Sequence, residues 1–260
     1  MSSAHNGPVS ILLLAGTAEA RELADRLAAV QAMAERRMRV IASLAGATAK
    51  PSALGVETRI GGFGGKEGLV GFLREADIDV VVDATHPFAA RITANAVDAC
   101  MAAKIDYLRL ERPAWQARPG DDWRSVATLA QAAALLPSGA RVFLGIGRKE
   151  IATFAERGDV RFVMRMIDPP AAGARVPGGE IVLGRPCAHE GGEIALLRHH
   201  AITHVVAKNS GGLSGRAKID AARTLALPVF MVDRPPSCGG HRVTSVAQAV
   251  RWIETWIASA

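Results

Sequence analysis

The chain has few cysteines, and their spacing excludes two classes of protein. Cys100, Cys187 and Cys238 are the only three in 260 residues, and no two of them form a C-x-x-C pair. An odd number of widely separated cysteines fits neither a disulfide framework nor a thiolate metal site. We therefore expect a protein of a reducing compartment that binds no metal.

Long apolar runs are also absent. None approaches the roughly 18 residues that span a bilayer. Residues 1–8 lack the basic stretch and apolar core of a secretion signal. The sequence therefore predicts a cytoplasmic protein that is neither exported nor embedded in a membrane.

Aromatic residues make up only 5% of the chain, and basic residues form no long run. Nucleic-acid binding usually needs clustered Lys and Arg with interleaved aromatics, so we expect no nucleic-acid partner. The net charge of +6 is unevenly placed. Lys and Arg match Asp and Glu at 15 to 15 in residues 1–133 but exceed them at 16 to 10 in residues 134–260. The excess in the second half favours a small polyanionic ligand.

The apolar pattern predicts alternating strands and helices. An unbroken apolar run at residues 10–15 ends at Gly16, and Leu23 and Leu27 then recur at helical spacing. This is typical of a buried parallel strand followed by an amphipathic helix. Further strands are predicted at 38–44, 57–61, 80–84, 106–110, 141–146, 162–167, 181–184, 204–208 and 229–233, and helices at 66–76, 88–103, 149–157, 191–201, 216–226 and 245–258.

The two halves share short stretches of sequence. Residues 107–113 resemble 229–235, both ending in Arg-Pro, and residues 126–132 resemble 243–249. Chance in an alanine-rich chain is the alternative to a duplication. A duplication predicts two Rossmann-like or flavodoxin-like parallel-sheet domains, 1–136 and 137–260, that face a common cleft.

Two glycine-containing turns in the first half could bind phosphate. Gly16 lies between a strand and a helix, where main-chain amides can approach an anion. Residues 59–65 contain four glycines in five positions. A tight turn at Gly16 and a mobile loop at 59–65 are the structural alternatives.

The end of the second strand bears on coenzyme choice. An acid at this position would select NAD, but the chain has Ser43 there, with Lys50 and Arg59 nearby. These residues leave room for a 2′-phosphate, so we expect NADP rather than NAD.

A polar cluster follows the strand at 80–84. His86 is a candidate proton donor, a cofactor contact or an ordinary turn residue, and Arg91 and Asn95 lie one helical turn apart behind it.

Cations gather at the predicted strand ends of the second half. Convergent cations of this kind could bind several carboxylates, and solvated basic loops are the alternative. The candidates are Arg148, Lys149, Arg165, Lys208, Arg216, Lys218 and Arg234.

Several motifs occur in a familiar order: Gly-Thr-x-Glu-Ala from Gly16, Ser-Leu-Ala-Gly from Ser43, Ile-Gly-Gly-Phe-Gly-Gly from Ile60, Asp-Ala-Thr-His-Pro-Phe-Ala from Asp83, and Lys-Asn-Ser-Gly-Gly from Lys208. In this order the chain resembles the precorrin-6A reductases of cobalamin synthesis over nearly its whole length. The resemblance implies an NADPH-dependent oxidoreductase that reduces one double bond of precorrin-6A to give precorrin-6B.

The resemblance also implies roles for residues. The nucleotide would contact Gly16, Thr17, Glu19, Ser43, Gly61, Gly62, Phe63, Thr85 and His86. The tetrapyrrole carboxylates or the nicotinamide end would face residues 147–149 and 208–212, which include Asn209, Ser210 and Gly211. One departure is Ala47, where many members have Arg. If that Arg binds the 2′-phosphate in those members, Lys50 or Arg59 would bind it here.

We expect hydride transfer from the nicotinamide with protonation of a neighbouring ring carbon, and His86 and Lys208 are the candidate catalytic acids. Two other functions remain open. One is a different NADP-dependent reductase of a small anion, and the other is a two-lobed binding protein for a nucleotide or tetrapyrrole. We expect a monomer or a weak homodimer.

Overall fold

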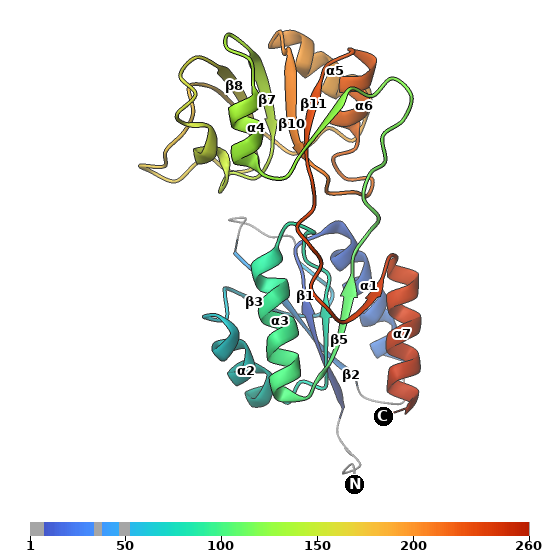
Figure 1. Cartoon of the computed structure of the whole chain (residues 1–260). Helices are drawn as coiled ribbons and strands as arrows, with labels where there is room; N and C mark the ends of the chain where they lie inside the picture. Colours follow the sequence, from blue (N-terminus) through green and yellow to red (C-terminus); the bar gives the residue numbers. More distant parts are fainter. Residues whose placement is uncertain (1–7, 34–37, 47–52, 260) are drawn as a thin grey trace. The chain divides into compact units, whose positions relative to one another are not determined.

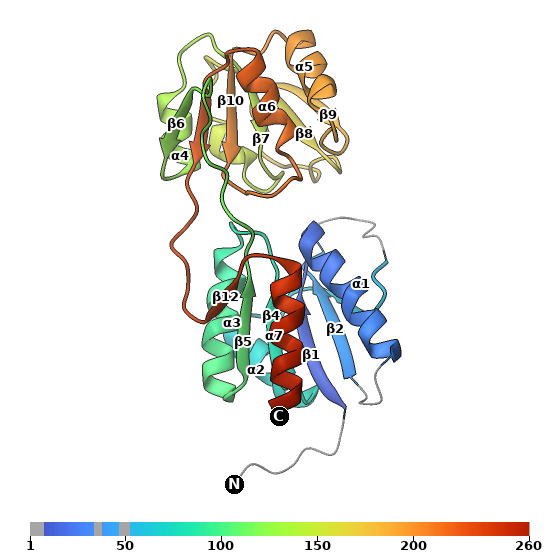
Figure 2. The ribbon, with the colours of Figure 1, turned by 90° about the vertical axis from the view of Figure 1, so that its right-hand side faces the viewer.

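The structure is a computed structural model that describes residues 8–33, 38–46 and 53–259. It divides into two compact α/β units (Figures 1 and 2). Unit 1 comprises Met1–Arg112 and Pro236–Ala260, and unit 2 comprises Pro113–Pro235. Each unit contains a six-stranded parallel sheet with helices on both faces, as the pattern of strands and helices predicts.

Unit 1 has the strand order β12-β5-β4-β1-β2-β3. Read from β3, this is the Rossmann order 3-2-1-4-5-6 rather than the flavodoxin-like order. Its elements are β1 (Val9–Leu14), α1 (Ala18–Met33), β2 (Met38–Leu44), β3 (Glu57–Ile60), α2 (Lys66–Glu75), β4 (Val80–Asp83), α3 (Ala90–Ala103), β5 (Asp106–Leu110), β12 (His241–Val243) and α7 (Val246–Ser259).

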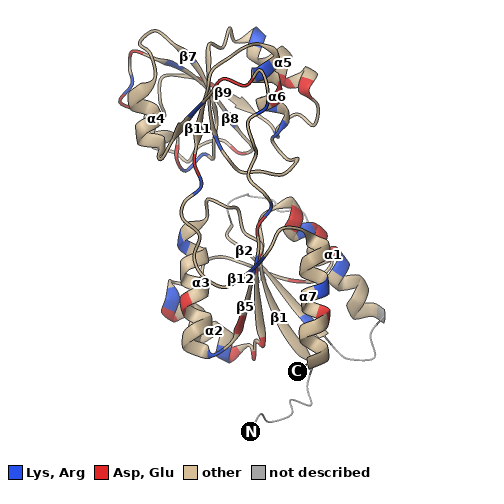
Figure 3. Ribbon diagram, turned by 45° about the vertical axis from the view of Figure 1, so that its right-hand side comes forward, with Lys and Arg blue, Asp and Glu red and all other residues tan. Residues whose placement is uncertain are grey.

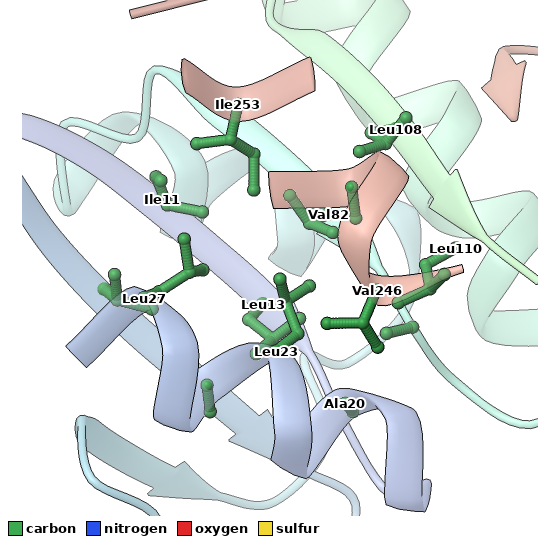
Figure 4. Packing of buried hydrophobic residues seen from close by; sticks show 14 of the residues in the cluster. Ile11, Leu13, Ala20, Leu23, Leu27, Val82, Leu108, Leu110, Val246 and Ile253 are labelled. Carbon is green, nitrogen blue, oxygen red and sulfur yellow. The ribbon is translucent and has the colours of Figure 1, made fainter. Parts of the chain in front are cut away.

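The side chains of β1 build both cores of unit 1, because successive residues of a strand point to opposite faces. Ile11 and Leu13 pack with α1 and α7, as Figure 4 shows for Leu23, Leu27, Val246 and Ile253. Leu12 and Leu14 pack on the other face against α2 and α3. A central strand buried on both faces accounts for the unbroken apolar run in the sequence.

Unit 2 has the equivalent strand order, β6-β11-β10-β7-β8-β9. Its elements are β6 (Trp123–Val126), α4 (Leu129–Leu135), β7 (Arg141–Gly145), η1 (a 3₁₀ helix, Ile151–Phe154), β8 (Arg161–Met166), β9 (Gly179–Leu183), α5 (Glu190–His199), β10 (His204–Lys208), α6 (Ala217–Thr224) and β11 (Val229–Val232).

The two faces of the unit 2 sheet are covered differently. Helices α5 and α6 cover one face through Leu197 and Ile219, which pack with Phe143 of β7. On the other face Phe154 of η1 packs edge-to-face on Phe162 of β8, with ring centroids 5.5 Å apart. The sequence predicts a helix over residues 149–157, but only the four-residue η1 forms there. One short turn is enough to bury Ile151 and Phe154 before the chain enters β8.

The units exchange their last strand and helix. The strand β6 follows β5 in the chain but pairs with β11 in unit 2, whereas β12 follows β11 but pairs with β5 in unit 1. The division therefore differs from the predicted boundary between residues 136 and 137. Sequence similarity between the halves could not reveal the exchange, because β6 and β12 occupy equivalent positions in either arrangement.

None of the helices in the described ranges is both long and apolar enough to cross a membrane. The cleft expected between the two domains stays a prediction.

Candidate functional site

In unit 1 the strand order reverses between β1 and β4. Open α/β sheets bind ligands at such a switch point, outside the carboxyl ends of the strands. The chain leaves β1 through Gly16 and Thr17, and it leaves β4 through Ala84, Thr85 and His86. The sequence-predicted nucleotide residues from two separate segments therefore meet at one edge of the sheet.

Gly16 and Thr17 form the turn before α1. Gly16 has a φ of 124°, which favours glycine. Apart from its chain neighbours, no atom of the described residues lies within 4 Å of the position that a Cβ would occupy. The Thr17 hydroxyl accepts a hydrogen bond from the Ala20 amide at 3.0 Å and donates one to the Ala84 carbonyl at 2.8 Å. Thr17 thus caps α1 and ties the turn after β1 to the turn after β4.

Arg59 lies at the ends of β2 and β3 in a fixed position. Its guanidinium donates to the Ser43 hydroxyl at 2.8 Å and to the carbonyls of Gly61 and Gly62 at 3.2 and 3.1 Å. It also lies 4.0 Å from the centroid of the Phe63 ring. Partial burial lowers the pKa of Arg59 from its ordinary value. Ser43, Arg59 and the glycine-rich loop therefore form one preorganised cationic surface.

The glycine-rich loop also has structural reasons for its composition. Gly61, Gly64 and Gly65 have positive φ angles, and a side chain at Gly68 would collide with the Phe63 carbonyl. The loop folds closely over the first turn of α2. Some of these glycines are therefore needed for the backbone conformation and not for ligand binding. Lys50 and Ala47 lie outside the described residues.

His86 is half-buried in the turn after β4. Its Nδ1 accepts a hydrogen bond from the Phe88 amide at 3.2 Å. This bond assigns the proton of a neutral imidazole to Nε2, which can act as a donor. The neighbouring Thr85 is buried, and its hydroxyl donates to Asp83 at 2.7 Å.

Glu19, in the first turn of α1, forms an ion pair with Arg112 at 2.6 Å. An unpaired carboxylate beside a helix N-terminus would repel a bound phosphate. The ion pair offsets this repulsion. Arg112 is also the residue at which the chain leaves unit 1 for unit 2.

The equivalent switch point of unit 2 lies between β10 and β7. Lys208, at the end of β10, forms an ion pair with Glu150, and Lys149 is exposed beside it. Arg148 lies 4.0 Å from Asp168 and donates to the Pro169 carbonyl. Among these three predicted cations, Lys149 is the most exposed to an incoming ligand.

Residues 209–211 hold the two chain segments that enter and leave unit 2. The Asn209 side chain accepts from the Trp115 amide at 2.8 Å and donates to the Trp115 carbonyl at 3.0 Å. Arg234 donates to the carbonyls of Asn209 and Ser210 at 2.9 and 3.0 Å. A side chain at Gly211 would collide with the Pro113 carbonyl and with Arg234. These residues therefore shape the loop after β10.

The side chain of Arg165 is buried rather than presented at the surface. Its guanidinium pairs with the fully buried Glu193 at 2.5 Å. Lys218, also buried, donates to the Gly215 carbonyl at 2.8 Å. The pKa of Lys218 is lowered to about 8, chiefly by burial and also by the Arg165 charge, whereas Glu193 opposes both effects. The Arg165 and Lys218 side chains are therefore not presented to a ligand at the surface of unit 2.

Residues 10–254 match the family model described as precorrin-6x reductase CbiJ/CobK. The chain belongs to this family. It is 45% identical over 247 residues to the precorrin-6A reductase of Rhodococcus erythropolis, covering 94% of this chain and 97% of that protein. It is 42% identical to the Mycobacterium tuberculosis H37Rv precorrin-6A reductase, covering 94% and 96%.

More distant relatives and a solved structure agree with the family. The cobalt-precorrin-6A reductase of Priestia megaterium is 31% identical, covering 86% of this chain and 90% of that protein. A solved structure titled CobK precorrin-6A reductase superimposes with a TM-score of 0.87 at 40% identity, covering 95% of this chain and 96% of that one.

The sequence motifs did not indicate the buried residues that support the switch points of the two sheets. Asp83, Arg109 and Trp115 were not singled out. An acid that ends an all-valine strand was the available signal for Asp83, since a buried carboxylate requires partners. Within the described ranges, no three His, Cys, Asp or Glu side chains are placed to hold a metal ion.

Proposed function

We propose that this chain reduces one carbon-carbon double bond of precorrin-6A to give precorrin-6B, with NADPH as hydride donor. The observation that carries the proposal is the switch point of unit 1 in a member of the precorrin-6x reductase family. An open turn at Gly16, after β1, and a fixed cation at Arg59, in β3, lie on either side of β2 in one sheet.

The residues of unit 1 fit a nicotinamide dinucleotide with a 2′-phosphate. The Gly16–Thr17 turn and the α1 N-terminus would receive the pyrophosphate. Ser43 and Arg59, at the ends of β2 and β3, would receive the 2′-phosphate, and no acid stands at Ser43 to select NAD. When bound, NADPH supplies a hydride.

Unit 2 would bind the carboxylate arms of the tetrapyrrole. Lys and Arg outnumber Asp and Glu by 16 to 11 in residues 113–235, and Figure 3 shows these charges on the ribbon. Lys149, Arg148 and Lys208 are the proposed contacts. Asn209, Ser210, Gly211 and Arg234 would support these contacts through the loop after β10, and Arg165 would do so from its buried pair with Glu193.

The proton that completes the reduction would come from Lys208 or His86. The Lys208→Met variant should lower kcat by about a hundredfold, since a positioned acid contributes at least that much. The matched Lys149→Met variant removes an exposed ammonium from the neighbouring loop and should raise KM for the tetrapyrrole while kcat is retained. Wild-type turnover and pH dependence in both Lys208→Met and His86→Ala would assign the proton to solvent or to a substrate carboxylic acid.

The direct test is anaerobic incubation of the purified protein with precorrin-6A and NADPH or NADH. The proposal predicts loss of the reduced-nicotinamide absorbance with NADPH, much less with NADH, and formation of precorrin-6B. Tight tetrapyrrole binding without turnover would indicate a binding protein instead. Turnover of NADPH with another small anion but not with precorrin-6A would indicate a different reductase.

A further inference from the structure

Asp83 ends the all-valine strand β4 and is completely buried. It stands one residue before the Ala84–His86 turn, at the edge of the unit 1 switch point. An ionised carboxylate is costly to bury unless hydrogen bonds and a counter-charge compensate it. Its partners therefore indicate what this carboxylate does for the protein.

The two carboxylate oxygens of Asp83 serve different parts of unit 1. Oδ1 accepts from the Thr85 amide at 2.9 Å and from the Thr85 hydroxyl at 2.7 Å, and it pairs with the Arg109 guanidinium at 2.6 Å. Oδ2 accepts from the Thr93 hydroxyl at 2.8 Å and from the Tyr107 hydroxyl at 3.0 Å. Oδ1 thus holds the turn after β4, whereas Oδ2 holds α3 and β5.

Thr85 is fixed at three points. Besides its two bonds to Asp83, its hydroxyl accepts from Arg109 at 3.0 Å. The preceding carbonyl, of Ala84, accepts from Thr17 in the turn after β1. The Thr85 hydroxyl is engaged within the protein, so its side chain supports the turn rather than contacting a ligand.

We propose that Asp83 is a positioning residue for the nicotinamide half of the coenzyme, acting through Thr85 and Arg109 on the turn after β4. The inference rests on the proposed function. The adenosine half would lie on the opposite side of β1, at Ser43 of β2 and Arg59 of β3. Loss of the Oδ1 bonds should therefore weaken binding of the complete dinucleotide and spare binding of its adenosine half.

Calorimetric titration with two probes separates these halves. NADP⁺ contains both the adenosine half and the nicotinamide half, whereas 2′,5′-ADP lacks the nicotinamide and its ribose. In Asp83→Asn we expect Kd for NADP⁺ to rise about tenfold, because an amide cannot replace a charged acceptor of three hydrogen bonds. The Kd for 2′,5′-ADP should stay within about twofold of the wild-type value.

The matched controls remove one bond each from Oδ2. Tyr107→Phe and Thr93→Val should lower the melting temperature but leave both dissociation constants unchanged. If Asp83→Asn does not fold, Thr85→Val and Thr85→Ser provide the same comparison. Thr85→Val should weaken NADP⁺ binding alone, and Thr85→Ser, which retains the hydroxyl, should restore it.

Three results would overturn the inference. The first is that Asp83→Asn and Thr85→Val bind NADP⁺ with the wild-type Kd. The second is that their Kd values for NADP⁺ and 2′,5′-ADP rise equally. The third is that Tyr107→Phe and Thr93→Val raise the Kd for NADP⁺ by the same factor. A wild-type protein that binds neither probe would overturn the proposed function as well, which distinguishes the two failures.

Discussion

Arg59 is the residue on which coenzyme choice should depend. Its guanidinium is held by Ser43, by two glycine carbonyls and by the Phe63 ring. A cation held in this way loses little conformational freedom when it binds a phosphate. Lys50, the other candidate, lies outside the described residues, so Arg59 is the one that can be tested from its geometry.

The Arg59→Gln variant should raise KM for NADPH about tenfold or more and leave KM for NADH nearly unchanged, since only NADPH carries the 2′-phosphate. Steady-state kinetics with both coenzymes checks this. The control is Arg39→Gln, which removes an exposed charge from the opposite end of β2. Equal losses with the two coenzymes would show that Arg59 supports the loop rather than the phosphate.

Lys218 should contribute a pH-dependent term to stability. Its pKa is lowered from 10.5 to about 8 in the folded protein, so between these values the unfolded chain binds more protons. The free energy of unfolding should therefore rise with pH across this window, by about 3 kcal/mol in total from this residue.

Urea unfolding of wild type and Lys218→Met checks this term. Burial also raises the pKa of the Cys100 thiol to about 12, with smaller contributions from Asp83 and Asp106. That shift lowers stability above about pH 9, but equally in both proteins. The free energy of unfolding of the wild type should therefore increase relative to that of Lys218→Met as the pH rises from about 8 to 10. Parallel pH profiles would mean that Lys218 is not desolvated.

At this scale the sequence located the residues of the turns and strand ends better than the buried residues that support them. Gly16, Ser43, Arg59 and His86 were identified because turns and strand ends can be located from local patterns. Asp83 was in a recognised motif, but its partners Thr93, Tyr107 and Arg109 come from the next helix and strand. Arg165 was predicted to bind substrate carboxylates, and its pairing with Glu193 could not be predicted because the two residues are 28 positions apart in the chain.

The exchange of β6 and β12 is the main feature that strand and helix patterns could not reveal. The repeat of Arg-Pro was recognised, and so was the similarity of residues 126–132 to residues 243–249, which lie at these strands and the helices after them. Which sheet each strand joins depends on the path of the chain after Arg112 and Arg234. Hydrophobic periodicity carries no information on that path, because either sheet would bury Val126 or Val243.

The exchange predicts which fragment folds. Residues 113–235 contain all six strands of the unit 2 sheet, whereas residues 137–260, of nearly equal length, lack β6 and α4 and expose the edge of β11. The first fragment should unfold cooperatively in urea, and the second should not, because it loses the buried Ala132 and Val126. Circular dichroism of both fragments checks this. A cooperative transition in the second fragment alone would contradict the exchange.

The whole molecule combines two sheets of the same order with unequal charge. Residues 113–235 carry a surplus of Lys and Arg of 16 to 11, whereas the remaining residues are close to balanced at 15 to 14. Equivalent folds with different charge suit two different ligands, a dinucleotide and a polycarboxylate. The sequence predicted this difference in charge between the halves because charged residues can be counted without a structure.

Transfer of the nicotinamide hydride to the tetrapyrrole is tested most directly with deuterium. The protein is incubated anaerobically with precorrin-6A and NADPH that carries deuterium at C4 in one or the other stereochemical position, and the tetrapyrrole is examined by mass spectrometry. We predict a reduced product that carries the deuterium from one of the two labelled coenzymes and not from the other. Tetrapyrrole of unchanged mass with both coenzymes, or a reduced product without deuterium from either, would contradict the proposed function.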